Sequence, residues 1–253
     1  MITPLQHAAW SGDLKAIREL LDAGAEIDER TDGLTPLMFA AKEAKLFAAR
    51  QLLKAGANVN AVAGPETPFQ GMSPLCLASV SVACVRPRAV EATVQLLLRA
   101  GAHVDHRDAD GWTPLMSAVA RPRGHVVELL LAAGANPNAR SRDGVTPLIA
   151  LARTFAFGMV FAQKRVLERT VSHLLQAGAS VDRKDSKGWT ALLHAAAEPR
   201  GRIVGLLLAA GADPNVQSRD GVTPLTAMER RYRRPRPRTD ETTRLLLAAG
   251  AKG

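Results

Sequence analysis

The residue types that could bind a divalent metal cluster once in this sequence, in the segment HVDHRDAD at residues 103–110. The candidate ligands are His103, Asp105, His106, Asp108 and Asp110. Consecutive positions of a hairpin point in different directions, so these side chains are not expected to converge on one ion. The other histidines are dispersed, and no Ser/His/Asp set, phosphate loop or dinucleotide motif can be assembled. We therefore predict no metal, no cofactor and no catalysis.

Arginine is the second candidate for chemistry, because its planar guanidinium binds carboxylates and phosphates in a bidentate manner. Pro-Arg pairs recur at 87–88, 122–123, 199–200 and 237–238, and six arginines surround Tyr232 in ERRYRRPRPRTDE. The candidate basic edge comprises Arg88, Arg123, Arg200, Arg231, Arg233, Arg234, Arg236 and Arg238. Two interpretations stay open: an edge that binds anions or nucleic acid, or a solvated surface rich in arginine through codon bias.

Net charge is distributed unevenly along the 253 residues. The formal charge of +9 comes wholly from the second half, which has 20 basic and 11 acidic residues, whereas residues 1–32 have three basic and seven acidic residues. We therefore expect a partner to be acidic where it meets the C-terminal part. No apolar run is long enough to span a bilayer. Cys76 and Cys84, eight residues apart on one expected helix, cannot form a disulfide there, which fits a reducing compartment. We predict a cytoplasmic protein, unless an export signal has been removed.

The elements that position these residues follow from an internal repeat. A Thr/Ser-Pro-Leu-like triplet recurs seven times, at Thr3, Thr35, Ser73, Thr113, Thr146, Thr190 and Thr223. A Leu-Leu-x-x-Gly-Ala segment follows each triplet, with its glycine at Gly24, Gly56, Gly101, Gly134, Gly178, Gly211 and Gly250. The Thr or Ser can cap a helix that proline begins, and the glycine can end a second helix in the left-handed conformation. Each unit is therefore a helix-turn-helix that must stack on its neighbours to bury its apolar stripe.

Segments such as DGWTPLMSAVA and VVELLLAAGANPN resemble the ankyrin repeat, and seven matches in register cover the chain. The resemblance implies a mainly α fold: an ankyrin-repeat solenoid of stacked helix-turn-helix units joined by β-hairpin loops. We expect a single ankyrin-repeat domain over residues 1–253. Its repeats are approximately 1–32, 33–64, 65–110, 111–143, 144–187, 188–220 and 221–253. The histidine that the family usually carries after Thr-Pro-Leu is absent from every unit, which puts its side-chain network in doubt.

Repeats 3, 5 and 7 are longer than the others between the triplet and the glycine, which predicts helix-turn insertions in these repeats. The insertion of repeat 5 carries Phe155, Phe157 and Phe161. Either both helices lengthen and these rings pack on the neighbouring repeats, or the rings form a docking ridge for a partner.

The resemblance implies a non-catalytic protein-binding scaffold that grips a partner through its concave face and hairpin tips. Trp112 and Trp189 can anchor a partner or pack at the hairpin base. The predicted partner-binding residues are His7, Trp10, Phe39, Lys42, Leu77, Val80, Trp112, Ser117, Arg140, Arg142, Arg153, Lys184, Lys187, Trp189 and His194. By analogy with bacterial chains of this family, the protein is a candidate inhibitor or immunity protein of a toxin enzyme. We expect a monomer with a protein partner, no membrane association and no nucleic acid. The alternative function is binding of anions or nucleic acid through the arginine-rich edge and the repeat 7 loop.

Overall fold

The computed structural model describes residues 2–81, 87–121, 124–154, 164–198, 201–232 and 240–252; the side chains of 154, 164–165 and 229–232 are not described. The described residues contain fourteen helices, two for each of the seven repeats. The first helix of each repeat is α1 (Pro4–Ser11), α3 (Pro36–Lys42), α5 (Pro74–Val80), α7 (Pro114–Val119), α9 (Pro147–Thr154), α11 (Ala191–Ala197) and α13 (Pro224–Tyr232). The second is α2 (Leu14–Asp22), α4 (Leu46–Lys54), α6 (Pro87–Arg99), α8 (Gly124–Ala132), α10 (Lys164–Gln176), α12 (Gly201–Ala209) and α14 (Glu241–Ala248).

The expected caps begin the first helix of every repeat. In each case the Thr or Ser hydroxyl accepts the backbone N–H of the third helical residue, over 3.1–3.4 Å. Proline occupies the first helical position in every repeat except repeat 6, where Ala191 does. The seven glycines that follow the second helices all have positive φ, between 86° and 97°. These contacts confirm the helix-turn-helix unit predicted from the triplet and the glycine.

The family's absent histidine is replaced differently from repeat to repeat. In repeat 1 the Gln6 amide accepts the backbone N–H of Thr3 over 2.8 Å and donates to the Leu34 carbonyl over 2.9 Å. In repeat 7 the Thr226 hydroxyl accepts the N–H of Thr223 over 2.8 Å. Cys76, at the same position of repeat 3, is buried, and burial raises the pKa of its thiol to about 11. Its neutral thiol therefore fills core space rather than acting as a nucleophile.

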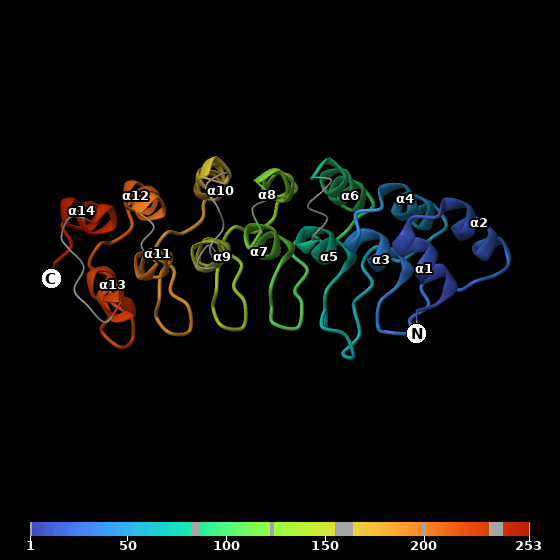
Figure 1. Ribbon diagram of the computed structural model, residues 1–253, viewed down its shortest axis with the longest axis horizontal. Helices are drawn as coiled ribbons and strands as arrows, with labels where there is room; N and C mark the ends of the chain where they lie inside the picture. Colours follow the sequence, from blue (N-terminus) through green and yellow to red (C-terminus); the bar gives the residue numbers. More distant parts are fainter. Residues whose placement is uncertain are drawn as a thin grey trace. The chain divides into compact units, whose positions relative to one another are not determined.

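The chain forms two compact units. Unit 1 consists of Met1–Ala118 and His125–Ala135, and unit 2 consists of Val119–Gly124 and Asn136–Gly253. The single domain expected over 1–253 stays a prediction. In unit 1 the row α1, α3, α5 packs against the row α2, α4, α6, and in unit 2 the row α9, α11, α13 packs against α10, α12, α14 (Figure 1). We call the first members the first-row helices and the second members the second-row helices. The hairpin loops extend from the first-row side of each unit.

The core of each unit lies between its two rows. The leucine of the triplet is at most 2% exposed in six repeats, at Leu5, Leu37, Leu75, Leu115, Leu148 and Leu192. Second-row helices contribute Ile17, Leu52 and Val94 in unit 1 and Val171, Val204 and Leu246 in unit 2, all fully buried. Paired alanines such as Ala40 and Ala41 let neighbouring first-row helices approach closely, since a methyl group occupies little space.

The loops between repeats reverse the chain as expected, but no described residue lies in a strand. Loops of both units are closed by a backbone hydrogen bond across the turn. Asp108 donates to Trp112 over 3.0 Å, and Asp185 to Trp189 over 2.9 Å. The backbone bonds across each turn are too few to make a ladder, so the loops are hairpins without β-structure.

The long repeats are described only at the helices that flank their insertions. Helices α6 and α10 have 13 residues, whereas α2, α4, α8 and α12 have nine. Phe155, Phe157 and Phe161 lie outside the described residues, so both interpretations of them stay open. The helix expected to carry both cysteines was wrong, because α5 ends at Val80 and Ser81 is not helical. Cys84 also lies outside the described residues.

Candidate functional site

The first-row helices of unit 1 present an exposed aromatic pair. Trp10 is 46% exposed, near the C-terminal end of α1, and its ring lies 5.7 Å from the ring of His7, which is exposed one turn earlier. An indole this exposed makes apolar surface available to a partner at little conformational cost, because only two side-chain torsions must be fixed.

The next first-row helices continue this face. Phe39 and Val80 are half-buried, and the Lys42 ammonium lies 5.3 Å from the centre of the Phe69 ring. Phe69 belongs to the long hairpin between repeats 2 and 3, and with Phe39 it packs on a buried cluster that includes Leu77. Leu77 was predicted to contact a partner, but the hairpin covers it and it is fully buried.

Ser117 was also predicted to contact a partner, and it too is inaccessible, with 3% of its surface exposed on α7. Trp112, at the base of the preceding hairpin, is half-buried. Its backbone N–H donates to the Asp108 carboxylate over 2.8 Å. Burial raises the pKa of Asp108, against the lowering effect of the N–H groups of Trp112 and Asp110. Asp108 therefore shapes the hairpin, and Trp112 is largely a packing residue.

The Asp108 carboxylate belonged to the cluster first considered as a metal site. Another candidate ligand, His106, is engaged by the backbone: its Nε2 lies 2.7 Å from the Gly71 carbonyl oxygen. In the part of the chain that the structure describes, no three His, Cys, Asp or Glu side chains are arranged to hold a metal ion.

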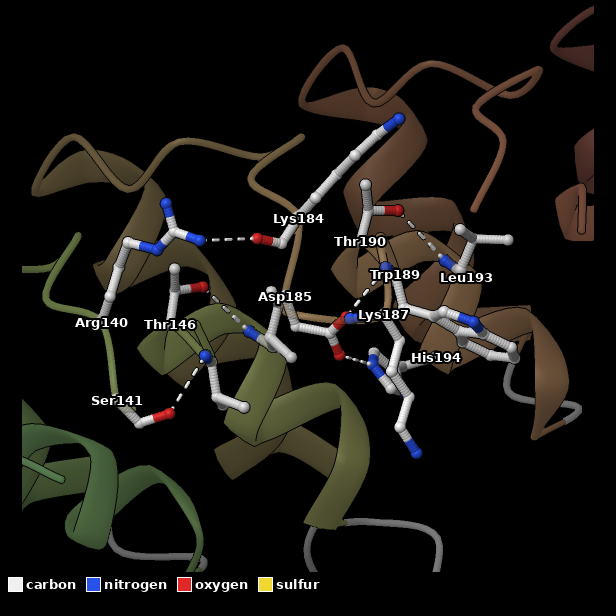
Figure 2. A network of polar contacts seen from close by, with 12 residues as sticks. Arg140, Ser141, Thr146, Lys184, Asp185, Lys187, Trp189, Thr190, Leu193 and His194 are labelled. Atoms are coloured by element: carbon white, nitrogen blue, oxygen red, sulfur yellow. Dashed lines mark hydrogen bonds and ion pairs between the residues drawn. The ribbon is translucent and has the colours of Figure 1, made fainter. Parts of the chain in front are cut away.

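In unit 2 a buried carboxylate organises the base of the hairpin between repeats 5 and 6 (Figure 2). Asp185 is 7% exposed, and its Oδ1 accepts the backbone N–H groups of Lys187 and Trp189, each over 2.9 Å. Its Oδ2 lies 2.9 Å from Nε2 of His194 on α11. Because an ionised carboxylate only accepts hydrogen bonds, His194 donates through Nε2–H.

His194 and Trp189 form the aromatic part of this site. Their ring centres are 5.0 Å apart, and Trp189 packs against a buried cluster of Leu193, Val216 and Val222. Burial lowers the pKa of His194, the bond and charge of Asp185 raise it, and the cations of Arg153 and Lys187 lower it further. The net effect is a lowered pKa, so the ring is mainly neutral at neutral pH.

The predicted basic residues of the unit 2 hairpins divide into two groups. Arg140 donates to the Lys184 carbonyl oxygen over 3.1 Å, and Lys184 donates to the Gln217 carbonyl oxygen over 2.9 Å. These two side chains join successive hairpins, and Figure 2 shows the bond from Arg140 to the Lys184 carbonyl oxygen. Arg142, Arg153 and Lys187 are exposed, and their side chains have no hydrogen bond or ion pair to any residue that the structure describes. These three cations are therefore available to a partner.

The unit 2 hairpins are nearly balanced in charge, with six basic and five acidic residues over 136–146, 180–190 and 213–223. The surplus of positive charge in the second half of the sequence therefore lies mostly outside these loops. Of the predicted basic edge, Arg88 is exposed at the start of α6, and Arg231 lies in α13 without a described side chain. Arg123, Arg200, Arg233, Arg234, Arg236 and Arg238 fall outside the described residues. The acidic partner therefore stays a prediction, supported in the described part of unit 2 by exposed cations on and beside the hairpins, among them Arg142, Arg153 and Lys187.

Two residues of this surface were missed in the sequence. Asp185 orients His194. The sequence feature that could have indicated its role is its position three residues before a hairpin glycine, the same position as Asp108. Phe69 packs on the cluster that includes Leu77. The sequence feature that could have indicated this is the extra length of the 61–72 loop. Neither signal reveals which side chain the loop covers, because that depends on how the loop folds back.

Comparison with known proteins identifies the repeats. A family model of three-copy ankyrin repeats matches residues 2–63 and 80–160, and a single ankyrin-repeat model matches 187–219. A segment of 46 residues is 54% identical to the human mitochondrial disaggregase and 52% identical to the bovine one, and spans 18% of this chain. The chain therefore covers only 6% and 7% of these relatives. The crystal structure of the human ASB11 ankyrin repeat domain aligns over 100% of both chains, with a TM-score of 0.76 and 25% identity. Among the described residues, no helix is long and apolar enough to cross a membrane.

Proposed function

Because the chain belongs to the ankyrin-repeat family, we propose that it is a non-catalytic scaffold that binds a partner protein through its first-row helices and hairpin loops. Ankyrin repeats generally mediate protein–protein interaction. The observation that supports the proposal most directly is the exposed Trp10 ring, which lies beside the ring of His7 at the first-row face of unit 1. Tryptophan is the side chain that most often dominates the free energy of binding at protein interfaces.

Within this function, the two units make different contributions. The unit 1 face offers Trp10, His7 and Phe39, which suit an apolar anchor of the partner. The unit 2 face offers the cations of Arg142, Arg153 and Lys187, which suit acidic residues of a partner and speed its association. Shape complementarity from preorganised helices lowers the entropy lost on binding.

The test uses the full chain, immobilised and exposed to native extract, with bound protein identified by mass spectrometry. Trp10→Ala should reduce capture of the partner by at least about tenfold, the loss typical of an interface hot spot. The matched control is Phe47→Ala, because Phe47 is an aromatic residue 63% exposed on the second-row helix α4. Equal loss in both variants, or capture that Trp10→Ala leaves unchanged, would contradict the proposal.

A narrower form of the proposal makes the chain an immunity protein that occludes a bacterial toxin enzyme. It is supported by analogy with the family, not by a residue of this chain. A neighbouring toxin gene whose product the chain inhibits would support it. Failure to protect cells against any co-encoded enzyme would end it. The cytoplasmic location and the monomeric state stay predictions.

The alternative, binding of anions or nucleic acid, draws on the arginines of 230–238 in the sequence. It predicts retention on a heparin-like resin that falls steeply with salt and is lost when these arginines are replaced. Partner capture that survives the same replacement would favour the protein-binding scaffold.

A further inference from the structure

His194 is bonded to one charged side chain and influenced by two others, and the scaffold function does not by itself explain this arrangement. Its Nε2 is held by the buried Asp185 carboxylate at 2.9 Å. The opposite ring nitrogen, Nδ1, has no partner among the described residues and is not one of their buried unpaired atoms. It therefore reaches solvent, on a side chain that is 18% exposed.

Two cations from different elements lower the pKa of this ring. Arg153 comes from the end of α9, which packs against α11, and Lys187 comes from the hairpin that Asp185 organises. Both act on His194 electrostatically, and neither side chain is paired within the described residues. Because Asp185 is already bonded to Nε2 of the ring, and neither cation is paired within the described residues, Arg153 and Lys187 are available to a further anion.

We propose that Arg153, Lys187 and His194 form a carboxylate-binding site that takes an aspartate or glutamate side chain of the partner protein. This inference rests on the proposed function, whose unit 2 contact it specifies. Arg153 offers a planar pair of N–H donors that matches a carboxylate, and Lys187 supplies a second charge. The protonated ring donates from Nδ1 to the ligand while Nε2–H stays on Asp185. Trp189 holds the ring from the side, at 5.0 Å.

The site makes binding depend on pH. The charged groups that face His194 from the described parts of the elements around it are Asp185, Lys187 and Arg153, with Glu198 at the end of its own helix. In the free protein the ring is mainly neutral at neutral pH. A bound carboxylate favours the imidazolium, so binding takes up a proton and becomes tighter as the pH falls.

The test measures binding of a fluorescein-labelled decaglutamate peptide to the full chain, at about pH 6 and about pH 8, where the peptide stays ionised and the imidazole titrates. Arg153→Gln and Lys187→Gln should each weaken binding by roughly 3- to 10-fold. The matched control is Arg244→Gln, which removes an exposed cation of the second-row helix α14 that is not among those acting on His194, and should change affinity by less than about 2-fold. His194→Gln should abolish the tighter binding at the lower pH.

Nuclear magnetic resonance of the His194 ring carbons gives a readout independent of affinity. Saturating decaglutamate should raise the pKa of His194, and a decaglutamine peptide should leave it unchanged. An unchanged pKa, or equal loss of affinity in Arg244→Gln and Arg153→Gln, would overturn the proposal. Tighter binding of a single-stranded oligonucleotide that still depends on Arg153 would also overturn it, because the ligand would then be phosphate. If decaglutamate fails while capture of a partner still depends on Trp10, this site is wrong and the scaffold stands.

Discussion

Asp182 lies four positions after the terminal glycine of the second helix, where repeats 1 and 3 also carry aspartate, Asp28 and Asp105, and repeats 2, 4 and 6 carry asparagine. Asn60, Asn138 and Asn215 each accept a backbone N–H of the next repeat and donate to its glycine carbonyl, over 2.7–3.1 Å. Asp182 accepts the N–H of Asp213 at 3.2–3.3 Å, and a carboxylate has no donor for the carbonyl. Burial raises the pKa of Asp182, the Asp213 N–H lowers it, and the Asp213 charge raises it.

Asp182→Asn should therefore stabilise the chain by about 0.5–1 kcal/mol at neutral pH, through one added hydrogen bond and the removal of repulsion from Asp213. A raised pKa in the folded state means that ionisation of Asp182 costs stability as the pH rises through that value. The gain from Asp182→Asn should thus shrink in acid, where Asp182 is protonated. Urea unfolding at neutral and acidic pH measures both effects. Asn138→Asp is the reverse change and should destabilise; if it does not, the amide contacts contribute nothing.

For His194 we predict a pH dependence of stability that is opposite in sign to that of Asp182. Burial lowers its pKa below the ordinary 6.5, so the folded state resists protonation that the unfolded chain accepts. Stability should be full above the ordinary pKa and should fall as the pH drops towards the folded-state value. His194→Gln should flatten the part of this pH dependence that the other histidines do not cause. Thermal unfolding of both proteins between about pH 8 and about pH 5, the range over which histidine titrates, measures the difference. Parallel curves for the two proteins would show that the ring is not buried as described.

At the scale of the elements, successive hairpins are joined by hydrogen bonds between their backbones. In unit 2, Ser186 donates to the Asp143 carbonyl over 2.7 Å, and Arg219 to the Lys187 carbonyl over 3.3 Å. Such contacts need glycine where two loops meet. A Cβ on Gly188 would lie 2.7 Å from the Arg219 nitrogen, closer than real Cβ atoms come.

Gly188→Ala should destabilise the chain more than Gly211→Ala, although both glycines have positive φ, at 77° and 86°. Gly211 has nothing within 4 Å of the added Cβ, so its substitution costs only the left-handed conformation, roughly 1–2 kcal/mol. Gly188→Ala adds a clash with the backbone of the next hairpin, and should cost roughly 1–3 kcal/mol more, as in overpacking of a filled site. Chemical unfolding of both variants separates the two effects. Equal losses would mean that the hairpins do not approach as closely as described.

At the scale of the whole molecule, the repeated triplet and glycines predicted the helix pairs correctly, because caps and left-handed turns are local. Which residues are exposed was harder to predict from the sequence. Trp10 and Lys187 are exposed as expected, whereas Leu77 and Ser117 are buried. Burial depends on neighbouring loops, and the 61–72 hairpin that covers Leu77 has no counterpart in the other repeats. Likewise, Arg140 and Lys184 were predicted from the sequence to bind a partner, but each donates a hydrogen bond to the following hairpin.

Amide hydrogen exchange of the free chain and of its complex with the captured partner tests the central claim most directly. The scaffold account predicts new protection in the hairpin loops and in first-row helices such as α1, α3 and α11. The second-row helices α2, α4 and α12 of the same repeats serve as the internal control, and their exchange should change little. Protection confined to the second-row helices, with the first row unaffected, would contradict the account.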